Sequence, residues 1–225
     1  KPTTNVAQHF NTVTWTGNTA STRGITGVGF QPDLVWFKTR SDVVHHQLYD
    51  SVRGAGTSTV KKALATSSSS GQAQGDGTVY GYLSQFDVDG FEVQRGSHAN
   101  QNTDANTYTN WDGRTYVAWC FKAGGAAVLN EEGSIDSQVS ANNDLGFSIA
   151  TYTGNNTANQ TVGNGLDSPV ELLIVKRTDT TGNWVVWNRD ATSGNGKYLY
   201  LDLTNGISGP AGTGVWDSSN TTTMP

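Results

Sequence analysis

The stretch FNTVTWTGN at residues 10–18 decides the fold, because it returns as FSIATYTGN at residues 147–155. The threonine, glycine and asparagine residues that end the two stretches keep a constant spacing of 137 positions, and Trp15 is matched by Tyr152. Such a match indicates an internal repeat, the first feature to seek in a sequence. In both stretches polar and apolar residues alternate before a Gly-Asn pair, which is typical of a β-strand ending in a turn.

Further blocks repeat in the same order. LVWFK at residues 34–38 corresponds to LLIVK at residues 172–176, now with a spacing of 138, and LYD at residues 48–50 corresponds to VWN at residues 186–188. One extra residue in a loop explains the change of spacing. We therefore expect a second and a third strand in each repeat.

The rest of the first repeat also has the pattern of strands. Residues 78–96 predict two strands joined by a turn at Asp89-Gly90, and residues 114–123 predict a closing strand. Local propensity would allow a short helix at residues 59–66, TVKKALAT. We predict a strand there, because the counterpart KYLYLDLT at residues 197–204 is strand-like.

These patterns predict an all-β fold of two tandem, jelly-roll-like β-sandwich repeats. We place the first at residues 6–123 and the second at residues 143–225. A connector at residues 124–142 joins them and contributes at most one short edge strand, at residues 133–140.

LVWFK and LLIVK are apolar at every position but the last, so both faces of these strands should be covered. A loop, the other repeat or a neighbouring subunit could supply the cover. After residue 188 the second repeat has too few residues for all the strands of the first. A sandwich without its final strands leaves unpaired edges, so we expect that the chain continues beyond Pro225 or, less readily, that another chain completes the sheet.

Composition and charge limit the classes of partner. Residues 1–123 carry ten Lys and Arg against nine Asp and Glu, and residues 124–225 carry four against ten. Without a basic stripe to neutralise phosphates, nucleic acid is not an expected partner. No apolar run approaches the roughly 20 residues of a membrane span, so membrane insertion is not expected. Cys120 is the single cysteine and is expected to be a small buried residue.

Residues 45–53, HHQLYDSVR, contain the residue types of a Ser-His-Asp triad. In a strand His46 and Asp50 would share a face, whereas Ser51 would point the other way. We therefore expect a polar strand end, with Arg53 fixing the following turn through carboxylate or carbonyl contacts.

Other catalytic and metal patterns are incomplete. Asp87-Val88-Asp89-Gly90 resembles the start of a calcium loop, but the twelfth position, where a Glu is needed, is His98. The histidines and Cys120 lack the spacing of zinc ligands, and nothing pairs two carboxylates for glycoside hydrolysis. We predict no catalytic residue, no metal and no cofactor.

A long polar loop, NQNTDANTYTNWDGR at residues 100–114, is the candidate ligand-binding segment. Aromatic rings stack on the apolar faces of sugars, while carboxylates and guanidinium groups bond the hydroxyls. This predicts a sugar site formed by Tyr108, Trp111, Asp112 and Arg114. The alternative is that Trp111 packs as a plug over the end of the sandwich.

Four segments together carry a resemblance to a known family. They are ITGVGFQPDLVWFKTR at residues 25–40, HHQLYDSVRG at residues 45–54, FDVDGF at residues 86–91 and YVAWCFKAGG at residues 116–125. In this order they resemble a repeat-containing family of tail-fibre and other virion structural proteins of bacteriophages of marine bacteria and cyanobacteria. The segments FSIATYTGN, LLIVKR and NWVVWN resemble the following repeat of that family.

The resemblance implies a structural protein of a phage particle, in a tail fibre or other surface appendage, that displays loops for recognising the host surface. It implies a homo-oligomer, a trimer in the first place, with other virion proteins and a host surface glycan as partners. The family offers no catalytic residues to carry over, and we expect no enzymatic activity. The alternatives are a carbohydrate-processing depolymerase and a lectin or adhesin module.

Overall fold

The structure, a computed structural model, describes residues 5–72, 79–97, 108–192, 197–209 and 223–224. Within these ranges a single turn of 3-10 helix, η1 (Val6–Gln8), is the one helical element, and all other regular elements are β-strands. Every named strand pairs antiparallel with its neighbours, so the prediction of an all-β, sandwich-type fold is confirmed. The chain divides into unit 1 (residues 1–122 and 178–181) and unit 2 (residues 123–177 and 182–225).

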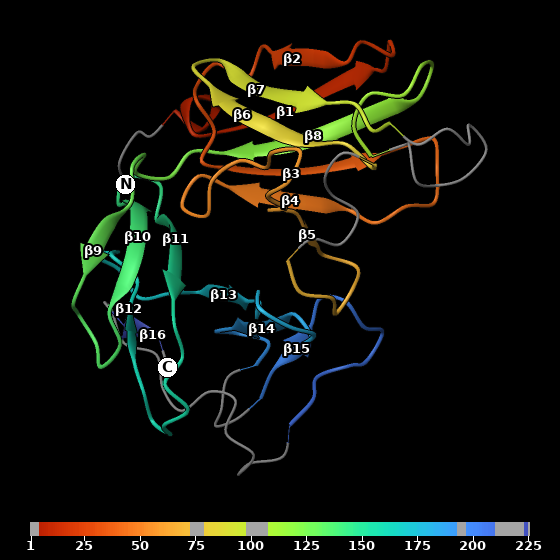
Figure 1. Cartoon of the computed structure of the whole chain (residues 1–225). Coiled ribbons are helices and arrows are strands. Elements are labelled where there is room, and N and C mark those ends of the chain that lie inside the picture. The colour runs from red at the N-terminus through yellow and green to blue at the C-terminus, as the bar shows by residue number, and fades with distance from the viewer. Residues whose placement is uncertain (1–4, 73–78, 98–107, 193–196, 210–222, 225) are drawn as a thin grey trace. The chain divides into compact units, whose positions relative to one another are not determined.

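Unit 1 is a sandwich of two sheets (Figure 1). A five-stranded sheet has the order β1-β8-β3-β4-β5, and a three-stranded sheet has the order β2-β7-β6. The strands are β1 (Phe10–Thr16), β2 (Thr22–Thr26), β3 (Leu34–Thr39), β4 (Gln47–Asp50), β5 (Leu64–Ala65), β6 (Tyr82–Asp87), β7 (Gly90–Gln94) and β8 (Thr115–Phe121).

The core of unit 1 lies between the two sheets. Burial alternates along β3 and β8, because successive side chains of a strand point to opposite faces. Aromatic rings fill the middle: Trp15 stacks on Tyr116 with centroids 5.0 Å apart, and Phe37 stacks on Tyr49 at 5.8 Å. The buried residues of this core are Trp15, Ile25, Val28, Phe30, Val35, Phe37, Tyr49, Ala63, Leu83, Phe91, Val93, Tyr116, Ala118 and Cys120.

The predicted hairpin of β6 and β7 is present, but its turn lies one residue earlier than expected. Val88 and Asp89 form the tip, and Gly90 already pairs with Asp87. Gly90 has φ +151°, and a Cβ there would lie only 1.9 Å from the carbonyl oxygen of Ile25. Glycine is thus required here by the close approach of β2 and not by the turn itself.

Asp89 joins the hairpin to the loop that follows β2. Its carboxylate accepts hydrogen bonds from the backbone N–H groups of Gly27 at 3.1 Å and Gly29 at 2.6 Å. Both glycines have positive φ angles, of +88° and +86°. The segments ITGVGF and FDVDGF, far apart in the sequence, therefore form one structural element.

The predicted strand at residues 59–66 is much shorter in the structure. Only Leu64–Ala65 pair, with β4, and a turn precedes them in which Thr57 and Val60 bond each other. The counterpart at residues 197–204 likewise contributes only β15 (Leu199–Tyr200). The backbone groups of the earlier residues bond within this turn or to side chains instead of forming a ladder.

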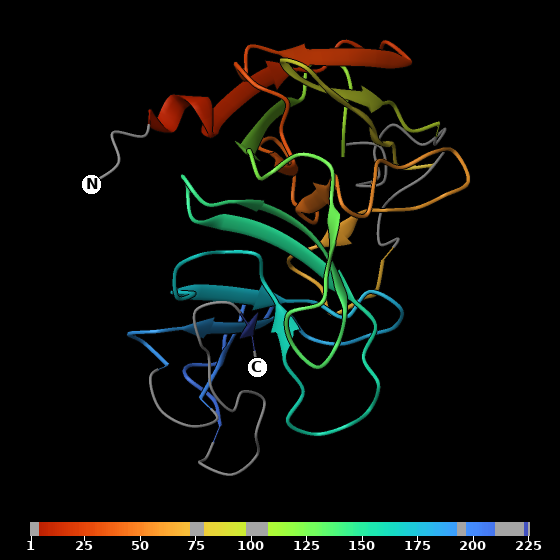
Figure 2. The ribbon, with the colours of Figure 1, turned by 90° about the vertical axis from the view of Figure 1, so that its left-hand side faces the viewer.

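In its described residues unit 2 forms three small sheets, with the orders β11-β10-β9, β13-β14-β15 and β12-β16. Both views show the hairpin of β10 and β11, in green and teal (Figures 1 and 2). The strands are β9 (Val128–Asn130), β10 (Ser137–Asn142), β11 (Phe147–Tyr152), β12 (Val162–Gly163), β13 (Leu172–Val175), β14 (Val185–Asn188), β15 (Leu199–Tyr200) and β16 (Thr223–Met224).

The segment expected to be a connector, residues 124–142, contains β9 and β10, and β10 is the central strand of its sheet, not an edge strand. Its buried residues are Ser137, Val139 and Ser140, so each face of the strand holds a buried serine. The hydroxyl of Ser137 donates to the carbonyl of Gly163 at 3.1 Å, and that of Ser140 donates to the carbonyl of Gly125 at 2.8 Å. Backbone acceptors satisfy these serines, so the strand is buried without an apolar pattern.

The strands of LVWFK and LLIVK, β3 and β13, differ in how their outer faces are covered. In unit 1 Trp36 is partly buried and packs against the ring of Trp119, with centroids 5.8 Å apart. In unit 2 Leu172 is 56% exposed and Ile174 is 42% exposed. Both faces of these strands were expected to be covered. Among the described residues, the outer face of β3 is partly covered and that of β13 is not covered.

Candidate functional site

The turn at residues 108–114 is held to the body of unit 1 by buried polar contacts. The amide oxygen of Asn110 accepts hydrogen bonds from the backbone N–H of Asn18 at 3.2 Å and from Nη1 of Arg23 at 3.1 Å. Its amide nitrogen donates to Oδ1 of Asn18 at 2.9 Å. Nε1 of Trp15 donates to the backbone carbonyl preceding Asn110. The second half of the predicted binding loop is thus rigidly placed, whereas residues 100–107 lie outside the described residues.

The structure brings three of the four predicted sugar-binding residues together. Trp111 is partly buried, Asp112 is exposed, and Nη1 of Arg114 forms an ion pair with Oδ1 of Asp42 at 2.9 Å. Tyr108 is only 8% exposed and points its ring into the unit, edge-on to another tyrosine. Its ring is not accessible for stacking on a sugar, and the accessible set is reduced to Trp111, Asp112 and Arg114.

Residues 45–53 do not form a triad. The hydroxyl of Ser51 donates to Oδ1 of Asp33 at 2.9 Å, and Nδ1 of His45 bonds the hydroxyl of Ser67 at 2.9 Å. The nucleophile of a triad must instead bond a histidine. His46 lies beside the ring of Trp36, and burial lowers its pKa.

The prediction for Arg53 is confirmed. Its Nε bonds Oδ2 of Asp50 at 2.6 Å, and its Nη1 bonds the carbonyl of Lys62 at 2.6 Å. The Arg53 N–H also donates to Oδ1 of Asp50 at 2.8 Å. A largely buried arginine therefore fixes the turn after β4 through one carboxylate, two backbone carbonyls and one side-chain amide oxygen.

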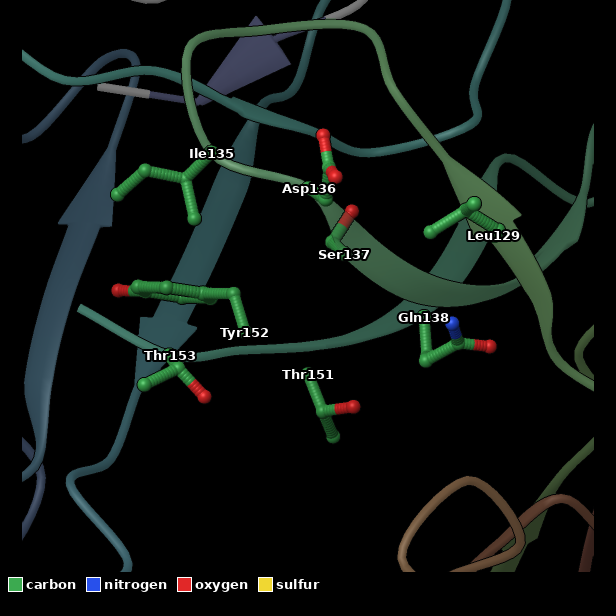
Figure 3. Close-up of a pocket in the computed structure, with 8 residues that line it drawn as sticks. All are labelled: Leu129, Ile135, Asp136, Ser137, Gln138, Thr151, Tyr152 and Thr153. Atoms are coloured by element: carbon green, nitrogen blue, oxygen red, sulfur yellow. The ribbon is translucent and has the colours of Figure 1, made fainter. Parts of the chain in front are cut away.

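A groove on unit 2 is a second candidate site, which sequence reasoning missed. It has a volume of about 450 Å³ and is open to solvent on one side. Figure 3 shows Tyr152 and Ile135 on one side of it, and Leu129 and Gln138 on the other. The lining residues are Leu129, Ile135, Asp136, Ser137, Gln138, Thr151, Tyr152 and Thr153.

The position of Tyr152 distinguishes this groove from the first repeat. Its counterpart Trp15 is a core residue, whereas Tyr152 is 43% exposed. The groove thus combines an accessible aromatic ring, the exposed carboxylate of Asp136, the amide of Gln138 and several hydroxyl groups. The repeat identified Tyr152 as an aromatic position, but Asp136 and Gln138 lie in the segment taken for a connector and carried no signal.

The described residues contain no group of three or more His, Cys, Asp or Glu side chains placed to hold a metal ion. In the same part of the chain, no helix has the length and apolar character needed to cross a membrane.

Comparison with known proteins assigns the chain to a family. No curated protein and no solved structure matches it. A family model described as "Domain of unknown function (DUF7483)" matches residues 5–224, which is nearly the whole sequence. The chain belongs to the DUF7483 family.

Proposed function

We propose that the chain is a structural protein of a bacteriophage particle, in a tail fibre or another surface appendage, where it assembles with other chains and presents loops to the host surface. The observation that carries the proposal is the repeat, in which one β-unit is used twice in succession with the motif order of the virion proteins described above. Folds alone do not define function, so the location in a particle is the decisive test.

The test is to locate the chain in intact particles of the phage that encodes it. Antibodies raised against the 225-residue chain, followed by gold labelling and electron microscopy, should mark tails or surface appendages. Labelling of no particle, or detection of the chain only in the lysate of the host, would contradict the proposal.

Assembly into a homotrimer is part of the proposal. Fibres are commonly built from identical chains around a symmetry axis, so the complete protein should give the mass of three chains in native mass spectrometry. A monomer at all concentrations would count against a fibre.

We also propose a second candidate function, the binding of a host glycan in the groove of unit 2. The specific observation is the half-exposed ring of Tyr152 beside a carboxylate, an amide and hydroxyl groups. A ring stacks on the apolar face of a sugar, and the polar groups bond its hydroxyls.

A glycan array followed by titration tests this function. Tyr152→Ala should weaken binding about tenfold, a loss of about 1.4 kcal/mol, whereas Tyr152→Phe should retain it because the ring is kept. Leu203→Ala, at an exposed position that does not line the groove, is the control. Equal binding by Tyr152→Ala and the wild type would exclude the groove, and release of reducing ends from the bound glycan would instead indicate a depolymerase.

A further inference from the structure

The strand that closes unit 1 has no counterpart among the strands described in unit 2. The repeat relates β1 to β11 and the run β3-β4-β5 to β13-β14-β15. In unit 1, β8 lies between β1 and β3 and pairs with both. In unit 2, β11 and β13 belong to different sheets, and β13 is an edge strand.

The backbone of β13 is oriented to receive a strand at this edge. In unit 1, Arg40 N–H bonds the Thr115 carbonyl, so by antiparallel alternation the even-numbered residues of β3 face β8. In unit 2, Arg189 N–H bonds the Glu171 carbonyl, so the odd-numbered residues of β13 face β14. The even-numbered residues of β13 therefore direct their backbone groups to the open edge.

Those residues are Leu172 and Ile174, the two exposed apolar side chains of the strand. A long exposed apolar edge is a template for strand addition, and soluble proteins usually protect it with charge, proline or a covering segment. Here Lys176, directly after β13, supplies a charge at one end of the edge, and Leu172 and Ile174 are uncovered in the described part of the chain.

Charge favours a strand of the β8 type. In unit 1, Lys122 follows β8 opposite Asp33, which precedes β3. The counterpart of Asp33 in unit 2 is Glu171, whose side chain is 68% exposed. A cation in the place that Lys122 holds after β8 would lie opposite Glu171, whose carboxylate also forms an ion pair with Arg189.

We propose that the free edge of β13 is a docking site for an added β-strand with the chemistry of β8, donated by a partner polypeptide. Such a strand alternates aromatic or β-branched residues with small ones and ends in a cation. The donor is not β8 of a second copy, because Tyr116, Ala118 and Cys120 are fully buried in its own unit. The inference rests on the proposed function, since an assembled particle supplies such partners, and it deepens it by naming the mode of assembly.

The probe is a synthetic peptide with the sequence of residues 114–122, carrying Cys120→Ser to prevent oxidation. Added to the 225-residue chain, it should slow hydrogen exchange at the amides of Leu172 and Ile174 at least tenfold, and a scrambled peptide should not. No protection with either peptide would overturn the proposal.

Ile174→Pro sharpens the test. Proline removes the N–H group that faces the open edge and leaves the bonds of Leu173 and Val175 to β14, so it should abolish peptide binding. Continued protection of the Leu173 amide shows that the variant is folded, and Ile174→Ala, which keeps the N–H group, is the matched control and should bind.

Two further outcomes would contradict the proposal. Wild-type binding by Ile174→Pro would place the peptide elsewhere. Concentration-dependent self-association of the chain without peptide, abolished by Ile174→Pro, would make a second copy the occupant. Peptide binding tests the edge alone and particle labelling tests the location, so the inference and the proposed function can fail separately.

Discussion

At the scale of single residues, unit 1 depends on a few carboxylates that fix loops. The N–H groups of Gly29 and Gly27 lower the pKa of the Asp89 carboxyl below its ordinary value of 3.8. Because the pKa is lowered in the folded state, the charged carboxylate stabilises the fold at pH values above 3.8. This contribution to the unfolding free energy is lost as the pH falls through the lowered pKa.

Asp89→Asn should therefore lower the melting temperature of unit 1 at pH 7, and the difference from the wild type should narrow once the pH falls below 3.8. Thermal unfolding followed by circular dichroism measures both. Asp87→Asn, in the same hairpin but at a side chain that bonds Gln85 instead of the glycine loop, is the control and should have little effect. A difference that stays constant with pH would show that the carboxylate does not act through its charge.

The buried pair of Asp50 and Arg53 has side chains only 6% and 9% exposed. Arg53→Met leaves the carboxylate buried without its cation, and we expect a loss of about 3 kcal/mol in the unfolding free energy of unit 1. Arg189→Met removes the exposed pair with Glu171 and should cost less than about 1 kcal/mol. Urea denaturation of both variants gives the comparison, and equal losses would refute the role of burial.

At the scale of elements, equivalent positions of a strand contribute differently to the stability of the two repeats. Phe37 is fully buried and stacks on Tyr49 and Phe91, whereas its counterpart Val175 is only partly buried. Phe37→Ala should lower the unfolding free energy of unit 1 by about 3–5 kcal/mol. Val175→Ala should lower the unfolding free energy of unit 2 by about 1 kcal/mol. Denaturant titrations test this, and a cost for Val175→Ala as large as that for Phe37→Ala would mean that the second core is as tight as the first.

The repeat allowed several elements to be predicted from sequence, and local detail decided the rest. The strands β1, β3 and β4 and their counterparts were found because their strand-like patterns recur in the same order at a nearly constant spacing. The strand β10 was not identified as a central strand, because two of its three buried residues, Ser137 and Ser140, are polar. The hairpin turn was predicted one residue too late. In the sequence Gly90 looks like a turn residue, but in the structure glycine is needed there because another strand passes too close for a side chain.

The candidate sites were predictable only in part. Trp111, Asp112 and Arg114 lie in one turn, as a short sequence separation requires. Tyr108 is buried, because the loop folds inward at Asn110, whose partners come from residues about 90 positions away. The groove at Tyr152 depends on strand pairing between residues 137 and 152, a contact that the sequence pattern does not specify.

At the scale of the whole molecule, the two units differ in the size of their cores. Among the residues that the structure describes, unit 1 has a continuous cluster of fourteen buried residues, whereas the cluster in unit 2 contains two, Val170 and Leu173, with partly buried neighbours. Local stability follows the density of buried contacts, so amides in β13 and β14 should exchange with solvent faster than those in β3 and β8. Hydrogen exchange with mass spectrometry measures this, and uniform protection in both units would contradict it.

The single cysteine gives experimental access to this difference. Cys120 is the second-last residue of β8 and has no exposed surface, and burial raises its pKa to about 12. A thiol reagent can modify it only in molecules whose first sandwich has come apart. The rate at which the wild-type protein is labelled therefore measures the opening of unit 1 alone. A lower rate in the presence of a partner bound to unit 2 would show that this binding also stabilises unit 1.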